Sequence, residues 1–486
     1  MKSLILMALA FFLLTGVVAY ADLHDTTNSA DYMIVSTRDL IANNVWIQDL
    51  AAWRNAHGRT ARAIAAEDIY TEFGSGTPSD TVLKEFFHYV RQHWQPPHLQ
   101  DVFIVGFHDV VPSHMMRDTV APDSQTYLSD MFYAADPDSA LPIPVFNIGR
   151  LPWSPTLSTP LWDYYAKVWT YERAAADDWQ NRVHLIADSS TWLFPWQDEA
   201  EAIAHSIRDG YAIERDYVDL PVGDPWHGDR SEIFNNLNSG SYLVAYAGLG
   251  TPDYWSYGLH LTESFFDSLT NEPRFPIILH VARNLGINGD FVVDDVSKSL
   301  LSNSHGGAIG YFGISNIAWL YSGFNFMLGL SSFATSDSVH VLGDIWRMAE
   351  QDYIHANAYA FDHQSPPRTT AFGNMLLGDP GVRLPPRPSA VGETPSPLPS
   401  AVELRGNYPN PFNSETIIVF RVRRNMHVAL NVYDILGRQV TTLLDEATTA
   451  GEYRIRWNAA GVAAGVYFAV LQTPGEKQVR KMLLLK

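Results

Sequence analysis

The chain has 486 residues, 46% of them apolar, and a formal net charge of −20. It is too long for one typical domain and too apolar to be disordered, so we expect two or three folded domains. Residues 402–486 carry +4, from 11 Lys and Arg against 7 Asp and Glu, which leaves −24 on residues 1–401. Because the acidic part would repel phosphate, we expect no nucleic-acid partner.

The amino terminus has the pattern of a secretory signal peptide. Lys2 precedes an apolar run over 4–18, and Ala19-Tyr20-Ala21 has the small-x-small form of a cleavage site. We therefore predict a signal peptide over 1–21 and a secreted or surface protein. The alternative is a membrane anchor, but the run is short for a span, and we expect no transmembrane helix in the mature chain. The chain has no cysteine, which a large core tolerates because disulfides mainly stabilise small secreted domains.

Short apolar runs alternate with amphipathic segments along the first part of the chain. This alternation predicts an α/β fold with a mostly parallel sheet flanked by helices. Predicted strands are 31–37, 60–66, 101–106 and 182–187, and predicted helices are 38–57, 79–94, 157–176 and 198–208.

Two later apolar runs, 242–247 and 275–282, each end in a turn rich in Gly or Asn. The first leads into Gly248-Leu249-Gly250-Thr251 with Trp255 downstream, and the second into Arg283-Asn284 and then Asn288-Gly289-Asp290-Phe291. Both are typical of buried parallel strands at their carboxyl ends. Ligands bind at that edge in open α/β sheets, so we place the candidate site there.

These residues resemble the gingipain-type cysteine peptidases, which have a caspase-like fold. In that family the position of Leu249 holds the catalytic His and the position of Arg283 holds the nucleophilic Cys. The resemblance also includes Ile148-Gly149-Arg150-Leu151, Gly307-Ala308-Ile309 and Gly378-Asp379-Pro380. It implies a peptidase domain over 22–385, with a first half of about 22–176 and a second half of about 177–385.

The residues at these two positions cannot perform the catalysis of that family. Thiolate catalysis needs a sulfur and a neighbouring imidazole, whereas leucine transfers no proton and arginine stays protonated. We therefore expect an inactive peptidase homologue that acts as a binding or surface protein for a peptide or protein ligand. The cleft would be formed by residues near the two turns: Gly248, Gly250, Trp255, His280, Asn284 and Asp290.

Two alternatives stay open. The chain could be an active peptidase with a relocated nucleophile, for which the candidates are His280, His260, Asp253, Ser256 and Ser315. It could also be an adhesive or structural protein in which the fold is only a stable block. His108 and Asp109 follow the strand at 101–106, where the resemblance implies a structural role. No cofactor is expected to be required, although Asp136 and Asp138 could hold calcium in an oxygen-rich loop.

A Pro-rich stretch over 386–401 predicts an extended linker. Residues 402–486 then show short alternating strands separated by Gly turns, which predicts an immunoglobulin-like antiparallel β-sandwich. This part resembles the type A sorting domain of the type IX (Por) secretion system through Asn410-Pro411-Phe412-Asn413, Tyr433-Asp434 with Gly437-Arg438, and Lys481-Met482. The resemblance implies that the translocon of that system reads residues 402–486 and exports the protein through the periplasm and the outer membrane.

Overall fold

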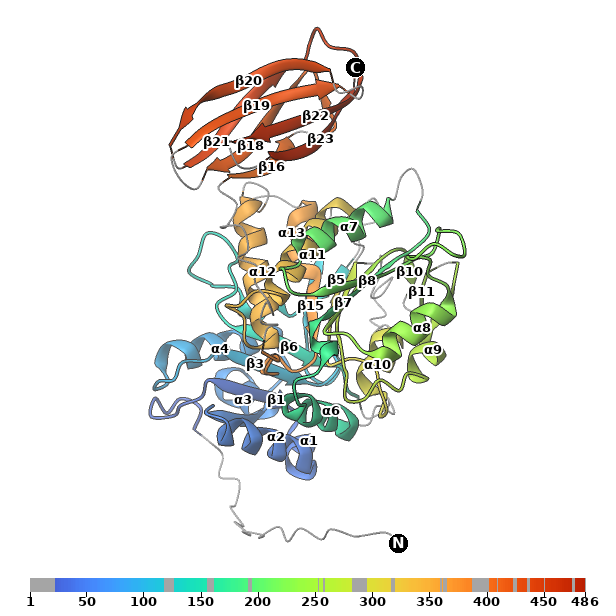
Figure 1. The fold of residues 1–486 in the computed structure, drawn as a ribbon. Coiled ribbons are helices and arrows are strands. Elements are labelled where there is room, and N and C mark those ends of the chain that lie inside the picture. Colours follow the sequence, from blue (N-terminus) through green and yellow to red (C-terminus); the bar gives the residue numbers. More distant parts are fainter. Residues whose placement is uncertain are drawn as a thin grey trace. The chain divides into compact units, whose positions relative to one another are not determined.

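The chain forms two compact units, Met1–Ser389 and Ala390–Lys486 (Figure 1). The computed structural model describes residues 22–117, 126–154, 161–190, 195–251, 253–256, 258–281, 295–315, 320–358, 361, 365–386, 402–408, 410–422, 426–434, 438–449, 451–473 and 477–485. The predicted signal peptide and nearly all of the predicted linker lie outside these residues, as do Arg283, Asn284 and Asp290. No described helix is long and apolar enough to cross a membrane.

A ten-stranded sheet forms the centre of the amino-terminal unit, in the order β2-β1-β3-β6-β15-β14-β13-β9-β7-β8. Every neighbouring pair is parallel except β14 and β15, which are antiparallel. The predicted mostly parallel sheet is therefore confirmed. The strands are β1 (Tyr32–Ser36), β2 (Ala61–Ala65), β3 (Asp101–Val105), β6 (Asn147–Leu151), β7 (Arg182–Ala187), β8 (Ala212–Tyr217), β9 (Leu243–Ala247), β13 (Ile277–Val281), β14 (Gly310–Ile314) and β15 (Asn374–Leu377).

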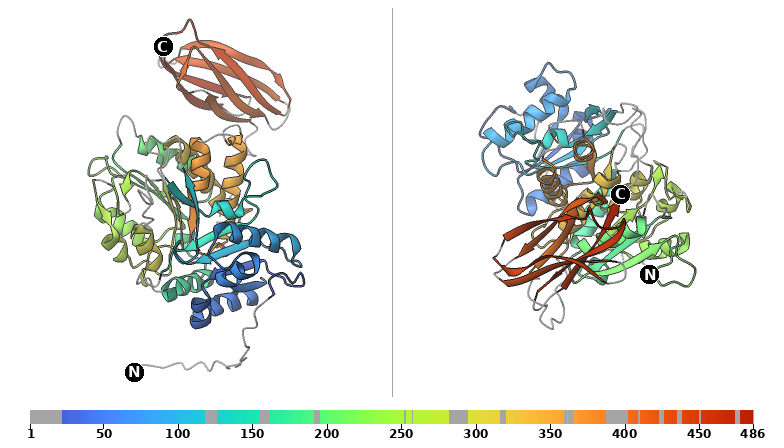
Figure 2. Two further views of the ribbon diagram at one scale, coloured as in Figure 1. Left: turned by 180° about the vertical axis from the view of Figure 1, so that it is seen from behind. Right: turned by 90° about the horizontal axis from the view of Figure 1, so that it is seen from above.

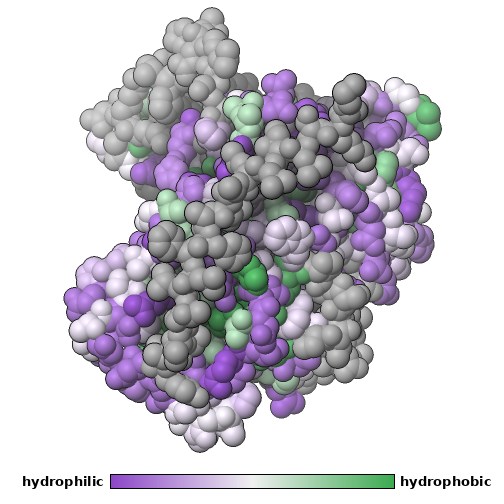
Figure 3. All heavy atoms as spheres, turned by 90° about the horizontal axis from the view of Figure 1, so that it is seen from below, coloured by the Kyte–Doolittle hydropathy of each residue, from purple (hydrophilic) through white to green (hydrophobic). Residues whose placement is uncertain are grey.

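Several inner strands are buried along their whole length. All five residues of β1, β3 and β9 are buried, as expected for parallel strands with helices on both faces. Helices α7, α11 and α12 cover one face and α2, α6 and α10 the other, and Figure 2 shows the same layers from behind. Polar side chains cover much of one outer face, with apolar residues between them (Figure 3).

The helices begin where the sequence provides caps. Ser79 caps α4 by accepting from the Val82 amide. Asp229 caps α8 by accepting from the Ser231 and Glu232 amides, and its own amide donates to the Glu232 carboxylate. The helices are α1 (Arg38–Asn43), α2 (Val45–Ala56), α3 (Ala66–Phe73), α4 (Asp80–His93), α5 (Met131–Ala134), α6 (Leu161–Arg173), a 3₁₀ turn (Asp178–Asn181), α7 (Trp196–Ser206), α8 (Arg230–Ser239), α9 (Glu263–Asp267), α10 (Asp295–Ser302), α11 (Leu320–Ala334), α12 (Leu342–Ala356) and α13 (Pro366–Gly373).

Two small sheets accompany the large one. Strands β4 (His114–Arg117) and β5 (Thr126–Ser129) form a hairpin ladder, and β10 (Gly250–Thr251), β11 (Tyr254–Trp255) and β12 (Leu261–Thr262) form a three-stranded sheet directly after β9. This second small sheet shapes the candidate site.

The carboxyl-terminal unit is an antiparallel β-sandwich of two sheets, β16-β18-β21 and β17-β23-β22-β19-β20. Burial alternates along β18, and the buried side chains of both sheets form one core with Phe420, Leu430, Trp457 and Met482. This confirms the predicted immunoglobulin-like domain. Its strands are β16 (Val402–Tyr408), β17 (Phe412–Asn413), β18 (Glu415–Val422), β19 (Met426–Asp434), β20 (Gln439–Thr448), β21 (Gly451–Asn458), β22 (Gly465–Gln472) and β23 (Lys477–Leu485).

Candidate functional site

The candidate site begins where the neighbouring parallel strands β9 and β13 end. Tyr246 is opposite His280 and Ala247 is opposite Val281, so the two strands reach the same sheet edge in register. The turn after β9 is described and contains Leu249, at the position where the resemblance expects the catalytic His. The corresponding position after β13, Arg283, lies outside the described residues.

Leu249 is held in place by its backbone. Its carbonyl accepts hydrogen bonds from the Tyr246 hydroxyl at 2.7 Å and from the Ser256 amide at 3.0 Å, and its side chain packs against the core. At Gly248 an added Cβ would clash with the Tyr246 hydroxyl and with Asp188. The turn therefore requires glycine there, and it presents an apolar side chain, not a proton carrier, at position 249.

Asp188 is the residue at this edge that sequence reasoning missed. It follows β7, is buried, and accepts from the Ser256 hydroxyl at 2.7 Å and from the Leu249 amide at 3.4 Å. Ser256 has a φ of +60°, a left-handed conformation that is uncommon for serine. The one available signal was an acidic residue directly after the buried run 182–187, because such residues lie at the ligand-binding edge of the sheet.

Trp255 and His280 lie beneath the turn and not at its surface. The Trp255 ring stacks on Tyr246 and on His280, with ring centroids 4.7 and 4.9 Å apart. The exposed fraction of Trp255 is 0% and that of His280 is 3%. His280 Nδ1 is 2.5 Å from the Tyr311 hydroxyl, and burial lowers the pKa of His280 to about 3. The imidazole is therefore neutral at physiological pH and is part of a buried aromatic stack.

The remaining nucleophile candidates do not form a serine–histidine pair. The Ser315 hydroxyl donates to the carbonyls of Leu128 and Gly373, and Ser256 donates to Asp188. His260 is exposed, with its ring against Tyr254, and Asp253 is exposed next to Thr251. Among the described residues, none of these serines is hydrogen-bonded to a histidine side chain.

The turn after β3, which contains His108 and Asp109, is organised by a buried arginine. Arg150 donates to the Asp130 carboxylate at 2.7 Å and to the carbonyls of Gly106 and Val111 at 2.7 and 2.8 Å. His108 is half-buried, burial lowers its pKa, and Asp109 is exposed. These contacts fix the fold of the turn.

The calcium candidates form a local turn. The Asp138 amide donates to the Asp136 carboxylate at 3.0 Å, and Asp138 is exposed. Within the described ranges, the group with metal-ligand spacing is His227, Asp229 and Glu232 instead. Asp229 and Glu232 cap α8, where the helix dipole is positive and disfavours a cation. Calcium at Asp136 and Asp138 stays a prediction.

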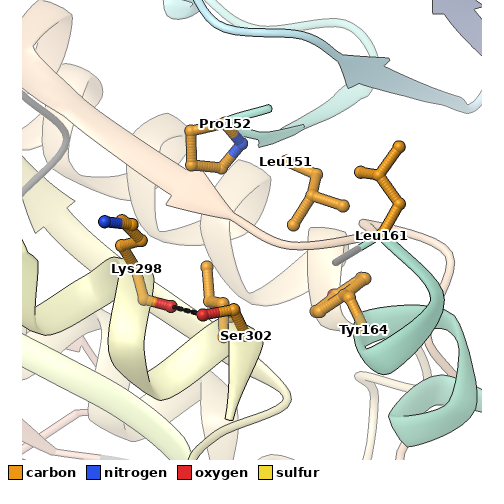
Figure 4. A pocket seen from close by; sticks show the side chains of 7 residues that line it. Leu151, Pro152, Leu161, Tyr164, Lys298 and Ser302 are labelled. Atoms are coloured by element: carbon orange, nitrogen blue, oxygen red, sulfur yellow. Dashed lines mark hydrogen bonds between the residues drawn. The ribbon is translucent and has the colours of Figure 1, made fainter. Parts of the chain in front are cut away.

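A small apolar cavity lies between α6 and α10, near the end of β6 (Figure 4). Its volume is about 10 Å³, enough for one water molecule at most. The hydrogen bond drawn there lies inside α10, where the Ser302 hydroxyl donates to the Lys298 carbonyl at 2.8 Å. The cavity is lined by Leu151, Pro152, Leu161, Tyr164, Lys298, Leu301 and Ser302.

The mostly parallel sheet with helices on both faces defines an α/β protein of gingipain-like fold. The model of peptidase family C25 matches residues 25–385, and the chain belongs to this family. The model of the secretion system C-terminal sorting domain matches residues 407–485. The protein is therefore a gingipain-family peptidase homologue that is exported by type IX secretion to the cell surface or the extracellular space.

Solved structures share the fold. The Arg-specific cysteine proteinase gingipain R is 16% identical, with 94% of this chain and 98% of that chain covered and a TM-score of 0.58. The complex of Porphyromonas gingivalis RgpB pro- and mature domains is 16% identical, with 93% and 100% covered and a TM-score of 0.56. A structure described as a protease is 15% identical, with 95% and 98% covered and a TM-score of 0.58. No curated protein matches the chain.

Proposed function

We propose that this chain is a catalytically inactive member of the peptidase family that binds a peptide or protein ligand at its former active-site edge. The observation that carries the proposal is the turn at Leu249, the position that the resemblance assigns to the catalytic base. Its backbone is fixed by Asp188, Tyr246 and Ser256. The absence of cysteine from the whole chain supports it, because the thiolate of the family has no substitute at Arg283.

Other groups near Leu249 do not offer a replacement mechanism. A serine nucleophile needs a base that takes its proton and donors that stabilise the oxyanion. Ser256 is buried and its hydroxyl is directed at a carboxylate, while His280 is buried and bonded to Tyr311. This arrangement favours binding over hydrolysis.

The test is a peptidase assay on the mature protein with a broad peptide library that includes Arg and Lys sites, with and without calcium. We expect no turnover and no reaction with thiol-directed inhibitors. The second measurement is binding of the same library to immobilised protein. We expect the wild-type protein to retain some peptides and the Leu249→Glu variant to bind them more weakly. Hydrolysis that disappears in Ser256→Ala or His280→Ala would instead establish an active peptidase with a relocated nucleophile.

The domain limits are part of the proposal. We propose that the signal peptide ends at Ala21, that 386–401 is the linker and that 402–486 contacts the type IX translocon. Amino-terminal sequencing of the exported protein tests the first limit, with Asp22 expected as the first residue.

A further inference from the structure

A cleft lies alongside β8, the edge strand of the large sheet. It is separated from β9 by β7, so it is distinct from the turns after β9 and β13. Its volume is about 550 Å³, and it is lined by residues of β8, of the loop 225–227 and of α8. Figure 1 labels β8 and α8. Its walls combine one indole with polar side chains, mainly Trp226, Glu214, Asp216, His227, Glu232 and Asn235.

Trp226 forms a rigid platform in this cleft. The Arg215 guanidinium lies over one face of the ring, 4.6 Å from its centroid. Arg215 is itself held by the Glu201 carboxylate, at 2.6 and 3.1 Å, and the Tyr217 hydroxyl donates to Glu201 at 2.6 Å. The indole is nevertheless 44% exposed. A ligand that stacks on it would therefore meet an ordered ring and cause little loss of side-chain entropy.

The carboxylates around the platform already have partners. Asp216 is 2.7 Å from His184 Nε2 and accepts twice from the Asn236 amide. Glu232 accepts from the Asp229 amide at 3.0 Å and lies 3.7 Å from His227 Nε2. Because a carboxylate has more lone pairs than these bonds use, the oxygens can still accept from a ligand hydroxyl.

Asn235 provides a free amide next to them. It lies three residues after Glu232, so both side chains are on the same side of α8. Asn235 is exposed, and its side chain forms no hydrogen bond within the part of the chain that the structure describes. It can therefore both donate to and accept from a ligand hydroxyl.

We propose that this cleft binds a carbohydrate, with a pyranose ring stacked on the open face of Trp226 and its hydroxyls bonded to Asn235 and Glu232. A pyranose has a flat face of C–H groups and a rim of hydroxyls that both donate and accept, which matches one indole beside amide and carboxylate groups. A basic peptide fits less well, because the Arg215 cation behind the indole opposes a second cation on its open face.

The chain contains a matched control for this platform. Trp169 on α6 is 42% exposed and also carries a guanidinium over its ring, that of Arg173 at 4.5 Å, but the described cleft does not include it. Trp226→Ala and Trp169→Ala therefore remove similar exposed indoles, and only the first removes a wall of the cleft.

The experiment measures binding of glucose, mannose, galactose and N-acetylglucosamine oligosaccharides to the full mature chain by saturation-transfer NMR and calorimetry. We expect at least one to bind, Trp226→Ala to weaken its binding about tenfold, Asn235→Ala to weaken it about threefold, and Trp169→Ala to leave it unchanged. The proposal is overturned if no oligosaccharide binds at 10 mM, roughly the weakest affinity of interest, or if both tryptophan variants bind equally. Binding of a deca-arginine peptide in place of the sugars, lost in Trp226→Ala, would overturn it in favour of cation recognition.

Discussion

The hydroxyl of Ser256 donates a hydrogen bond to the carboxylate of Asp188 over 2.7 Å, across 68 positions of sequence. This bond joins the small sheet after β9 to the end of β7 and fixes the turn that contains Leu249. It makes Ser256 a structural residue at a position where a nucleophile could otherwise stand.

Replacing Ser256 should therefore reduce stability. In Ser256→Ala the buried Asp188 carboxylate loses a donor, so we expect the free energy of unfolding to fall by about 1–2 kcal/mol. Chemical denaturation measures this. Ser264→Ala, which removes an exposed hydroxyl on α9, is the control and should change stability by less than about 0.5 kcal/mol. Equal stability of the two variants would contradict the role of the Asp188 contact.

A buried lysine should make stability depend on pH. Lys167 on α6 is 2% exposed and donates to the Leu300 carbonyl at 2.8 Å, and burial lowers its pKa to about 7. The unfolded chain binds this proton up to about pH 10.4, so between pH 7 and 10 it binds more protons than the folded chain. Lys167 therefore lowers the free energy of unfolding at pH 7, and this loss becomes smaller as the pH rises toward 10.

Lys167→Met should be more stable than the wild type at pH 7, by up to about 5 kcal/mol, and the difference should shrink toward pH 10. Denaturant unfolding of both proteins at pH 7, 8.5 and 10 measures it. Lys298→Met, which removes a partly exposed lysine on α10, is the control for losing a lysine. A difference that stays constant with pH would refute the buried-cation explanation.

The buried ion pairs of Arg54 should be among the most sensitive contacts of the amino-terminal unit. Arg54 on α2 is 2.5 Å from both Glu172 and Asp379, and all three side chains are buried. Removing one partner leaves buried charge uncompensated, so Arg54→Ala should lower the free energy of unfolding by about 3–5 kcal/mol. Arg383 also pairs with Glu172 but is 43% exposed, and Arg383→Ala should cost less than about 1 kcal/mol. Thermal and denaturant unfolding of the two variants measures the difference. Similar losses of unfolding free energy in Arg54→Ala and Arg383→Ala would contradict the prediction.

Export should depend on the carboxyl-terminal unit. A chain that ends at Ser389 keeps the whole amino-terminal unit but lacks the sorting domain. In a bacterium with type IX secretion we expect this chain to accumulate in the periplasm, whereas full-length protein and its Trp169→Ala variant reach the surface or the medium. Cell fractionation with antibody detection measures the distribution. Truncated protein in the medium would show that residues 402–486 are dispensable for export.

Much of the fold could be predicted from the sequence because inner strands such as β9 are continuous apolar runs and a Pro-rich stretch separates the domains. The predicted helix over 38–57 is wrong in one respect, since Asn44 ends α1 and caps α2 through its side chain. Periodicity cannot detect such a break, because both helices keep the same apolar spacing. The antiparallel contact of β14 and β15 was likewise not predicted.

The candidate site was predictable only as a position along the chain. Gly248 and Leu249 could be placed from the turn after an apolar run, but the role of Asp188 depends on contacts 61 and 68 residues away. Trp255 and His280 were expected beside the cleft, and the structure buries both under the turn. Side chains next to an irregular turn can point toward solvent or into the core. The sequence of such a turn has no periodicity that would distinguish the two directions.

The position of β15 has a consequence for how this protein folds. This strand is the last of the large sheet in sequence, yet it lies between β6 and β14 and so joins the four strands on one side to the five on the other. Just beyond it, Asp379 accepts from the Tyr32 hydroxyl of the first strand at 2.7 Å, across 347 positions. Contacts so distant in sequence make folding slow. The sheet is therefore incomplete until nearly the whole amino-terminal unit has been synthesised, so a partly made chain lacks the strand that joins its two halves.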